Sequence, residues 1–120
     1  MITNFENITH ELTDDELAIV PLVISGFKRY TKDFTIKAPD VVSRFNASGK
    51  SHVQLTEPRL RKIVNYIRSN GLIALVATSQ GYYVSSDKDE IMKQVESLRQ
   101  RANSIHRCAD GLQLLLNKSG

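Results

Sequence analysis

The chain contains a single cysteine and no long apolar run. Cys108 has no partner within the chain, so an intrachain disulfide is excluded and a reducing compartment is expected. No apolar stretch approaches the roughly 20 residues that span a bilayer. The N-terminus also lacks the basic-then-apolar order of a secretory signal. These absences predict a cytoplasmic protein that does not enter a membrane.

The groupings of residues that form common catalytic and metal sites are missing as well. The three histidines have no metal-ligand spacing with Cys108. His106 lies two residues before Cys108, so on a helix the two side chains would point in different directions and could not form a catalytic pair. The six glycines are scattered and form no phosphate-binding loop. We therefore expect no enzyme, metal, cofactor or small-molecule substrate.

Length and charge set broad limits. A chain of 120 residues is large enough for one domain with a buried core. Its net charge of +3 and sequence pI of about 9.1 permit nucleic-acid binding without demanding it. The sequence divides into a polar N-terminal arm (residues 1–12), a central domain (13–87) and a C-terminal helix (88–120). It has no internal repeat and no low-complexity segment.

The most informative stretch runs from Leu55 to Asp87. Its first half has the apolar spacing i, i+3, i+4 and i+7 of an amphipathic helix, at Leu60, Ile63, Val64 and Ile67. Thr56 suits the N-cap, and Pro58 falls in the first turn, where a helix tolerates proline. Gly71 suits the left-handed position that follows a helix C-terminus. These residues together predict a helix with a buried apolar stripe.

Charge on this helix is one-sided. At 100° per residue the side opposite the apolar stripe carries Arg59, Lys62, Asn65, Tyr66 and Ser69, and Arg61 and Arg68 lie on its flank. Only Glu57 is acidic, and it lies in the first turn, where the helix dipole favours a negative charge. A solvated helix face without a partner is the plain interpretation. Cations with few compensating anions, next to groups that suit bases and phosphates, favour a DNA contact.

A β-hairpin is predicted directly after this helix. Residues 73–78 alternate in the manner of a strand, Ser79–Gly81 suits a turn, and Tyr82–Val84 resumes the strand pattern. Side chains alternate along a strand, so one of the two tyrosines should point inward and the other outward. Packing is the plain role for both. The sharper hypothesis is a wing contact to DNA from Ser79, Gln80 and the outward tyrosine.

The preceding residues predict two more helices and a short strand. Thr13 and Glu16 form a capping box that opens a helix with one apolar face, at Leu17, Val20, Ile24 and Phe27. Pro21 should kink or split that helix. Phe34–Ile36 is a candidate short strand, and Pro39–Asn46 a candidate second helix with Val41, Val42 and Phe45 apolar. Helix, strand, helix, helix and hairpin follow one another as in a winged helix.

The last segment predicts a long helix with a heptad seam. Its apolar residues are spaced alternately by four and three, at Ile91, Val95, Leu98, Ala102, Ile105, Ala109, Leu112 and Leu116. A helix of about 28 residues would be about 42 Å long, longer than this domain is wide. The seam could pack along its own domain. We favour a homodimer contact, parallel or antiparallel, through Ile91, Val95, Leu98, Ala102, Ile105 and Leu112.

The span from Leu12 to Leu115 resembles winged-helix DNA-binding domains. More narrowly, PRLRKIVNYIRSNGLI, ATSQGYYV and ESLRQRANSI resemble a family of small phage and prophage-associated winged-helix proteins with a C-terminal helix. The resemblance implies an α+β, mostly α fold, made of three helices and a hairpin wing followed by a long helix. It places eight residues where winged helices meet DNA: Arg59, Arg61, Lys62, Asn65, Tyr66, Arg68, Gln80 and Tyr82.

The expected function is therefore DNA binding, as a phage or prophage regulator or replication accessory that binds duplex DNA as a homodimer. The alternative is a winged helix that serves only as a protein-interaction module, because a fold does not fix a function. RNA binding is a third possibility, for which stacking aromatic residues should cluster. Tyr66 and Tyr82 are too few to decide that question.

Overall fold

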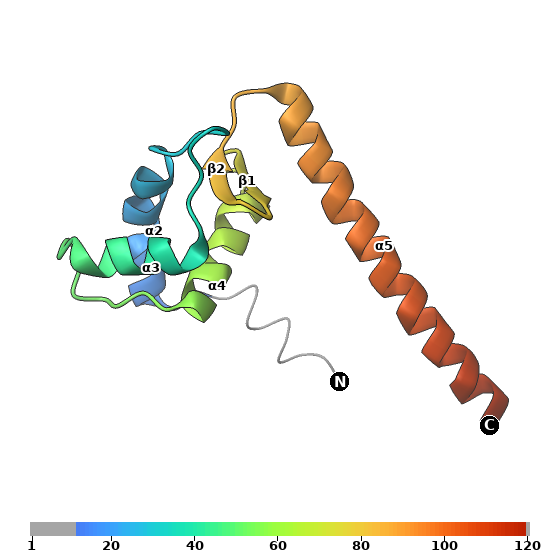
Figure 1. Cartoon of the computed structure of the whole chain (residues 1–120). Coiled ribbons are helices and arrows are strands. Elements are labelled where there is room, and N and C mark those ends of the chain that lie inside the picture. The colour runs from blue at the N-terminus through green and yellow to red at the C-terminus, as the bar shows by residue number, and fades with distance from the viewer. Residues whose placement is uncertain (1–11, 120) are drawn as a thin grey trace. The chain divides into compact units, whose positions relative to one another are not determined.

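The computed structural model describes residues 12–119, which are mostly helical with one small antiparallel sheet (Figure 1). The predicted α+β, mostly α class is confirmed. The predicted N-terminal arm, residues 1–12, lies outside the described residues except for Leu12. The chain divides into two compact units, Met1–Ser86 and Asp87–Gly120, and each is described by itself.

Helix α2 spans Asp14–Phe27 and begins with the predicted capping box, in which the Thr13 hydroxyl accepts from the Glu16 amide and the Glu16 carboxylate accepts from the Thr13 amide. The expected split at Pro21 does not occur. Pro21 is exposed, so water can satisfy the carbonyl that its missing N–H leaves without a partner.

The predicted apolar face of α2 is partly wrong. Val20 and Phe27 are buried as expected, but Leu17 is 40% exposed and Ile24 is only half-buried. Ile19 and Val23 take their places in the core. The helix carries apolar residues on several sides, so its periodicity does not single out one face. Packing against the rest of the unit, and not the sequence pattern, selects the face.

Helices α3 (Ala38–Ala47) and α4 (Glu57–Ser69) agree closely with prediction. The Thr56 hydroxyl accepts from the Arg59 amide, and Gly71 has the expected positive φ, at 61°. All four residues of the predicted stripe are buried, namely Leu60, Ile63, Val64 and Ile67. By contrast α3 has no fully buried residue, and its Val41, Val42 and Phe45 are half-buried at the edge of the core.

The hairpin consists of β1 (Leu75–Thr78) and β2 (Gly81–Val84), joined by a turn at Ser79 and Gln80. The strand expected at Phe34–Ile36 shrinks to a single antiparallel bridge between Ile36 and Tyr82, with a second bridge from Thr31 to Phe34. The chain before α3 therefore runs beside the hairpin. Gly81 permits this approach, because a Cβ there would lie 2.5 Å from the Ile36 carbonyl oxygen and its φ is 130°.

Helix α5 spans Lys88–Ser119, 32 residues in one continuous helix. From Glu96 to Lys118 every side chain is exposed. On the predicted seam, Ile91 and Val95 are half-buried, whereas Leu98, Ile105, Leu112 and Leu116 are exposed.

Candidate nucleic-acid interface

The basic side of α4 is less open than its sequence predicts. Two of its cations, Arg59 and Lys62, reach the carboxylate of Glu16 on α2. The Arg59 Nε donates to Glu16 Oε2 at 3.0 Å, and the Lys62 Nζ donates to Glu16 Oε1 at 2.9 Å. The Arg59 Nη1 also donates to the Gln54 carbonyl at 2.7 Å. The expectation that these cations lack a compensating anion is therefore wrong, because an acidic residue more than 40 positions earlier in the chain faces them.

Glu16 performs two tasks with one carboxylate. Its side chain is only 4% exposed, and burial alone would raise its pKa. The hydrogen bond from the Thr13 amide, together with those from Lys62 and Arg59, outweighs that burial and lowers the pKa of Glu16 below its ordinary value of 4.5. The carboxylate thus remains ionised, caps α2 and fixes α2 against the N-terminal half of α4.

The other predicted contacts on α4 divide by exposure. Arg61 is exposed, and Asn65 is half-exposed on the same side of the helix. Arg68 is directed toward the hairpin, since its Nε donates to the Leu75 carbonyl at 3.1 Å. Tyr66 is half-buried and packs against the core. Arg61 and Asn65 are thus the residues on this face best placed to meet a ligand.

The wing contains one suitable contact and one unsuitable one. Gln80 is exposed in the turn, where the Thr78 hydroxyl accepts from its amide and the Thr35 hydroxyl donates to its carbonyl. Tyr83 is the buried tyrosine. Tyr82 does not point freely outward as expected, because its half-buried ring meets Phe27 edge-on with centroids 5.4 Å apart. Tyr82 serves the packing between α2 and β2.

Sequence reasoning missed Lys37. This exposed residue lines a shallow hollow together with Thr78 and Ser79, so it adds a cation beside the wing turn. The bridge from Ile36 to Tyr82 brings it there. The sequence did contain a signal for this position, namely the short strand pattern before α3. A strand must pair with another strand, and the hairpin was the partner at hand, so the residue after Ile36 had to lie near it.

The predicted dimer residues share one side of α5, because spacings of four and three place them along a stripe. Along this stripe Val95 is half-buried and Leu98 is 36% exposed, whereas Ile105 and Leu112 are 69% and 65% exposed. Ala102 lies between them and is also exposed. Such a continuous apolar stripe in water is unusual for a helix without a partner.

Two negative results apply to residues 12–119. These residues contain no group of three side chains able to hold a metal ion, and none of their helices is long and apolar enough to cross a membrane. No protein-family model, curated protein or solved structure matches the chain.

Proposed function

We propose that residues 13–87 form a winged helix that binds duplex DNA through the exposed side of α4 and the turn of the hairpin. The observation that carries the proposal is the pairing of Ile36 with Tyr82, which adds a third extended segment to the hairpin. Together with the order α2, α3, α4 and hairpin, this pairing supports an arrangement in which a recognition helix and a wing act together. A role as phage regulator or replication accessory belongs to the same proposal and rests on the sequence resemblance.

The proposed contacts follow from exposure and chemistry. Arg61 can bind phosphate, or the paired acceptors of a guanine in the major groove. Asn65 carries the amide that pairs with adenine, and Gln80 and Lys37 suit the backbone beside the wing. Arg59 and Lys62 add a weaker positive potential, since each shares the Glu16 carboxylate.

A protein-interaction module is the second candidate function. The observation in its favour is the same Glu16 carboxylate, which neutralises two of the cations expected to meet DNA. A surface on which charges are matched internally attracts phosphate less strongly. The two candidates differ in what they require of Arg61, because an interaction module should tolerate reversal of its charge better than a DNA-binding protein.

The test is the affinity for a fluorescent 24-base-pair duplex of mixed sequence at low salt, measured by anisotropy. Arg61→Glu should weaken binding about tenfold, as expected when a phosphate contact becomes a repulsion. Arg107→Glu makes the same change of net charge on the side of α5 opposite the seam and should alter affinity less than threefold. Equal losses in both variants, or no binding by the unmodified protein, would favour the interaction module.

We further propose that two copies of α5 pair to form a homodimer, with the helices antiparallel. In antiparallel register each small seam residue faces a large one, such as Ala102 against the partner's Ile105 and Ala109 against the partner's Leu98. Parallel pairing would instead stack alanine on alanine and leave narrow layers between wide ones. Since facing large and small residues fill space evenly, the seam composition favours the antiparallel form.

Spin labels distinguish the two directions. In a Cys108→Ser background, Lys118→Cys supplies one labelling site near the end of α5. Antiparallel pairing centred between Ala102 and Ile105 separates the two labels by about 45 Å, and parallel pairing places them within about 20 Å. A distance near 20 Å would overturn the antiparallel form. The absence of any dipolar signal at high protein concentration would overturn the dimer.

A further inference from the structure

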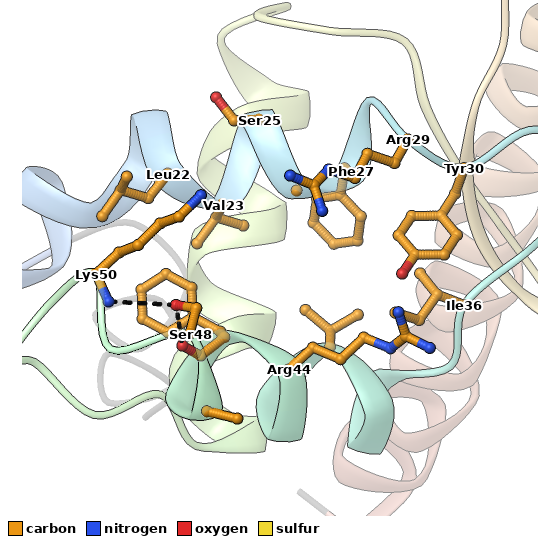
Figure 2. Close-up of a pocket in the computed structure, with 14 residues that line it drawn as sticks. Leu22, Val23, Ser25, Phe27, Arg29, Tyr30, Ile36, Arg44, Ser48 and Lys50 are labelled. Carbon is orange, nitrogen blue, oxygen red and sulfur yellow. Dashed lines mark hydrogen bonds between the residues drawn. The ribbon is translucent and has the colours of Figure 1, made fainter.

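A cavity of about 450 Å³ lies between α2 and α3, on a different part of the first unit from the residues proposed to meet DNA. Figure 2 shows its apolar wall, formed by the side chains of Val23, Phe27 and Ile36, with α3 opposite α2. Val41 and Phe45 of α3 also line it. The cavity explains why α3 has no fully buried residue, because the side chains that face α2 do not meet a filled surface. Its volume is typical of small-ligand pockets.

The charged side chains at the rim of this cavity are all positive. Arg29, Arg44 and Lys50 are exposed and border the opening, and no acidic residue is among the residues that line it. They come from three different segments, namely the turn that follows α2, the last turn of α3 and the loop after α3 (Figure 2). Within residues 12–118 none of these three cations has an ion-pair partner, in contrast to Arg59 and Lys62.

Tyr30 adds a polar group inside the apolar wall. Tyr30 is only 7% exposed, and its hydroxyl points into the cavity on the side of Arg44 (Figure 2). A hydroxyl donor and a guanidinium that line the same cavity suit an oxyanion, because both groups donate hydrogen bonds and the guanidinium supplies positive charge. The cavity thus combines an apolar interior with anion-binding groups at its edge.

We propose that this cavity binds a small amphipathic anion, an aromatic or aliphatic carboxylate whose apolar part lies between α2 and α3 and whose charged group lies at the rim. Aromatic side chains at Phe27, Tyr30 and Phe45 offer surfaces on which a ring can stack. Burial of the apolar part supplies most of the affinity, and Arg29, Arg44 and Lys50 select for negative charge. This inference does not rest on the proposed DNA binding.

The test uses naphthalene-2-carboxylate and its uncharged analogue, naphthalene-2-carboxamide, titrated into the full-length protein by calorimetry. The two compounds have the same ring and differ in charge, so the ratio of their affinities reports the contribution of the rim. The carboxylate should bind with a single site and at least tenfold more tightly than the amide. In NMR spectra of the protein, the chemical shifts of backbone N–H groups should change most at Val23, Phe27 and Phe45 when the carboxylate binds.

Matched variants locate the charge selection. The double variant Arg29→Gln, Arg44→Gln should bind naphthalene-2-carboxylate about tenfold more weakly and naphthalene-2-carboxamide as tightly as the unmodified protein does. Lys28→Gln removes an adjacent cation that does not line the cavity and should change neither affinity by more than twofold. No saturable binding of the carboxylate, equal binding of acid and amide, or equal losses in the Arg and Lys28 variants would overturn the proposal.

Discussion

In residues 12–86 most of the large apolar side chains pack against one another, whereas in α5 most of them face water. The first unit encloses a core in which Leu60, Ile63 and Ile67 have no measurable exposure. In α5, Ile105 and Leu112 are each about two-thirds exposed. The two regions have similar apolar residues and differ in whether one chain can cover them. The first unit therefore has its stabilising contacts within the chain, and α5 lacks them over most of its length.

This difference assigns separate tasks. A helix alone is only marginally stable in water, because most helical stability in proteins comes from packing of an apolar face. In the proposed dimer, pairing of two α5 helices would supply that packing, and the proposed DNA contacts all lie on the first unit.

The largest effect is expected from charges on the seam. Leu98→Asp with Ile105→Asp buries four carboxylates in each proposed dimer, so the dimer should dissociate at least a hundredfold more readily. Sedimentation equilibrium measures this change. Arg107→Asp lies on the opposite side of α5 and should leave the mass unchanged. A monomeric unmodified protein at tens of micromolar would contradict the division of tasks.

Truncation of an apolar side chain should lower the unfolding free energy in both units, but only in α5 should the loss depend on protein concentration. Ile63→Ala removes a fully buried side chain and should cost about 2–5 kcal/mol of unfolding free energy. This loss should be the same at every protein concentration, whereas the loss from Ile105→Ala should vary with it. Chemical denaturation at two concentrations checks both. An unchanged midpoint for Ile63→Ala would show that the phase of α4, and with it the proposed DNA face, is wrong.

Two glycine-to-alanine substitutions should change stability in opposite directions. Gly81→Ala forces a Cβ against the Ile36 carbonyl at an unfavourable φ, so we expect a loss of about 2–3 kcal/mol in thermal stability. Gly111→Ala meets nothing within 4 Å in the middle of α5 and should stabilise that helix by about 0.5–1 kcal/mol. Stabilisation by Gly81→Ala would show that the bridge to Ile36 does not form.

Glu16→Gln should destabilise the first unit by about 2–3 kcal/mol at neutral pH, because two partly buried cations lose their partner and water screens part of that loss. The folded-state pKa of Glu16 is lowered, so its contribution is complete above its ordinary value of 4.5 and disappears as the pH falls through the folded value. The unfolding free energies of Glu16→Gln and the unmodified protein should therefore converge at low pH, and chemical denaturation from pH 7 to pH 2 measures both. A difference independent of pH would show that the carboxylate charge is not responsible.

Glu16→Gln should also change DNA binding. Glu16→Gln frees Arg59 and Lys62 from their anion, so its affinity for DNA should rise severalfold although its fold is weaker. A loss of affinity in the folded variant would show that Glu16 positions those cations for binding.

The sequence alone predicts elements whose signals are local. Thr56, the stripe from Leu60 to Ile67 and Gly71 define α4 almost completely, because a cap, a period and a stop signal coincide there. The four-and-three spacing of the last segment likewise predicts α5. Each of these features depends on residues within a few turns of one another.

Contacts between distant residues were beyond this reasoning. The capping box gave Glu16 a sufficient role, so nothing local indicated that it also binds Arg59 and Lys62. Alternation predicted that one tyrosine would be outward, but it could not show that Phe27 lies beside Tyr82. The cavity between α2 and α3 depends on how two helices pack, for which the sequence contains no periodic signal.

The most direct test of the proposed function is the salt dependence of binding by the unmodified protein to a mixed-sequence duplex. Each phosphate contact releases counterions, so the logarithm of the association constant should fall linearly with the logarithm of salt concentration. With two recognition units in a dimer we expect a slope of about −4 or steeper, from at least four or five phosphate contacts. No detectable binding at low salt, or a slope near zero, would contradict DNA binding.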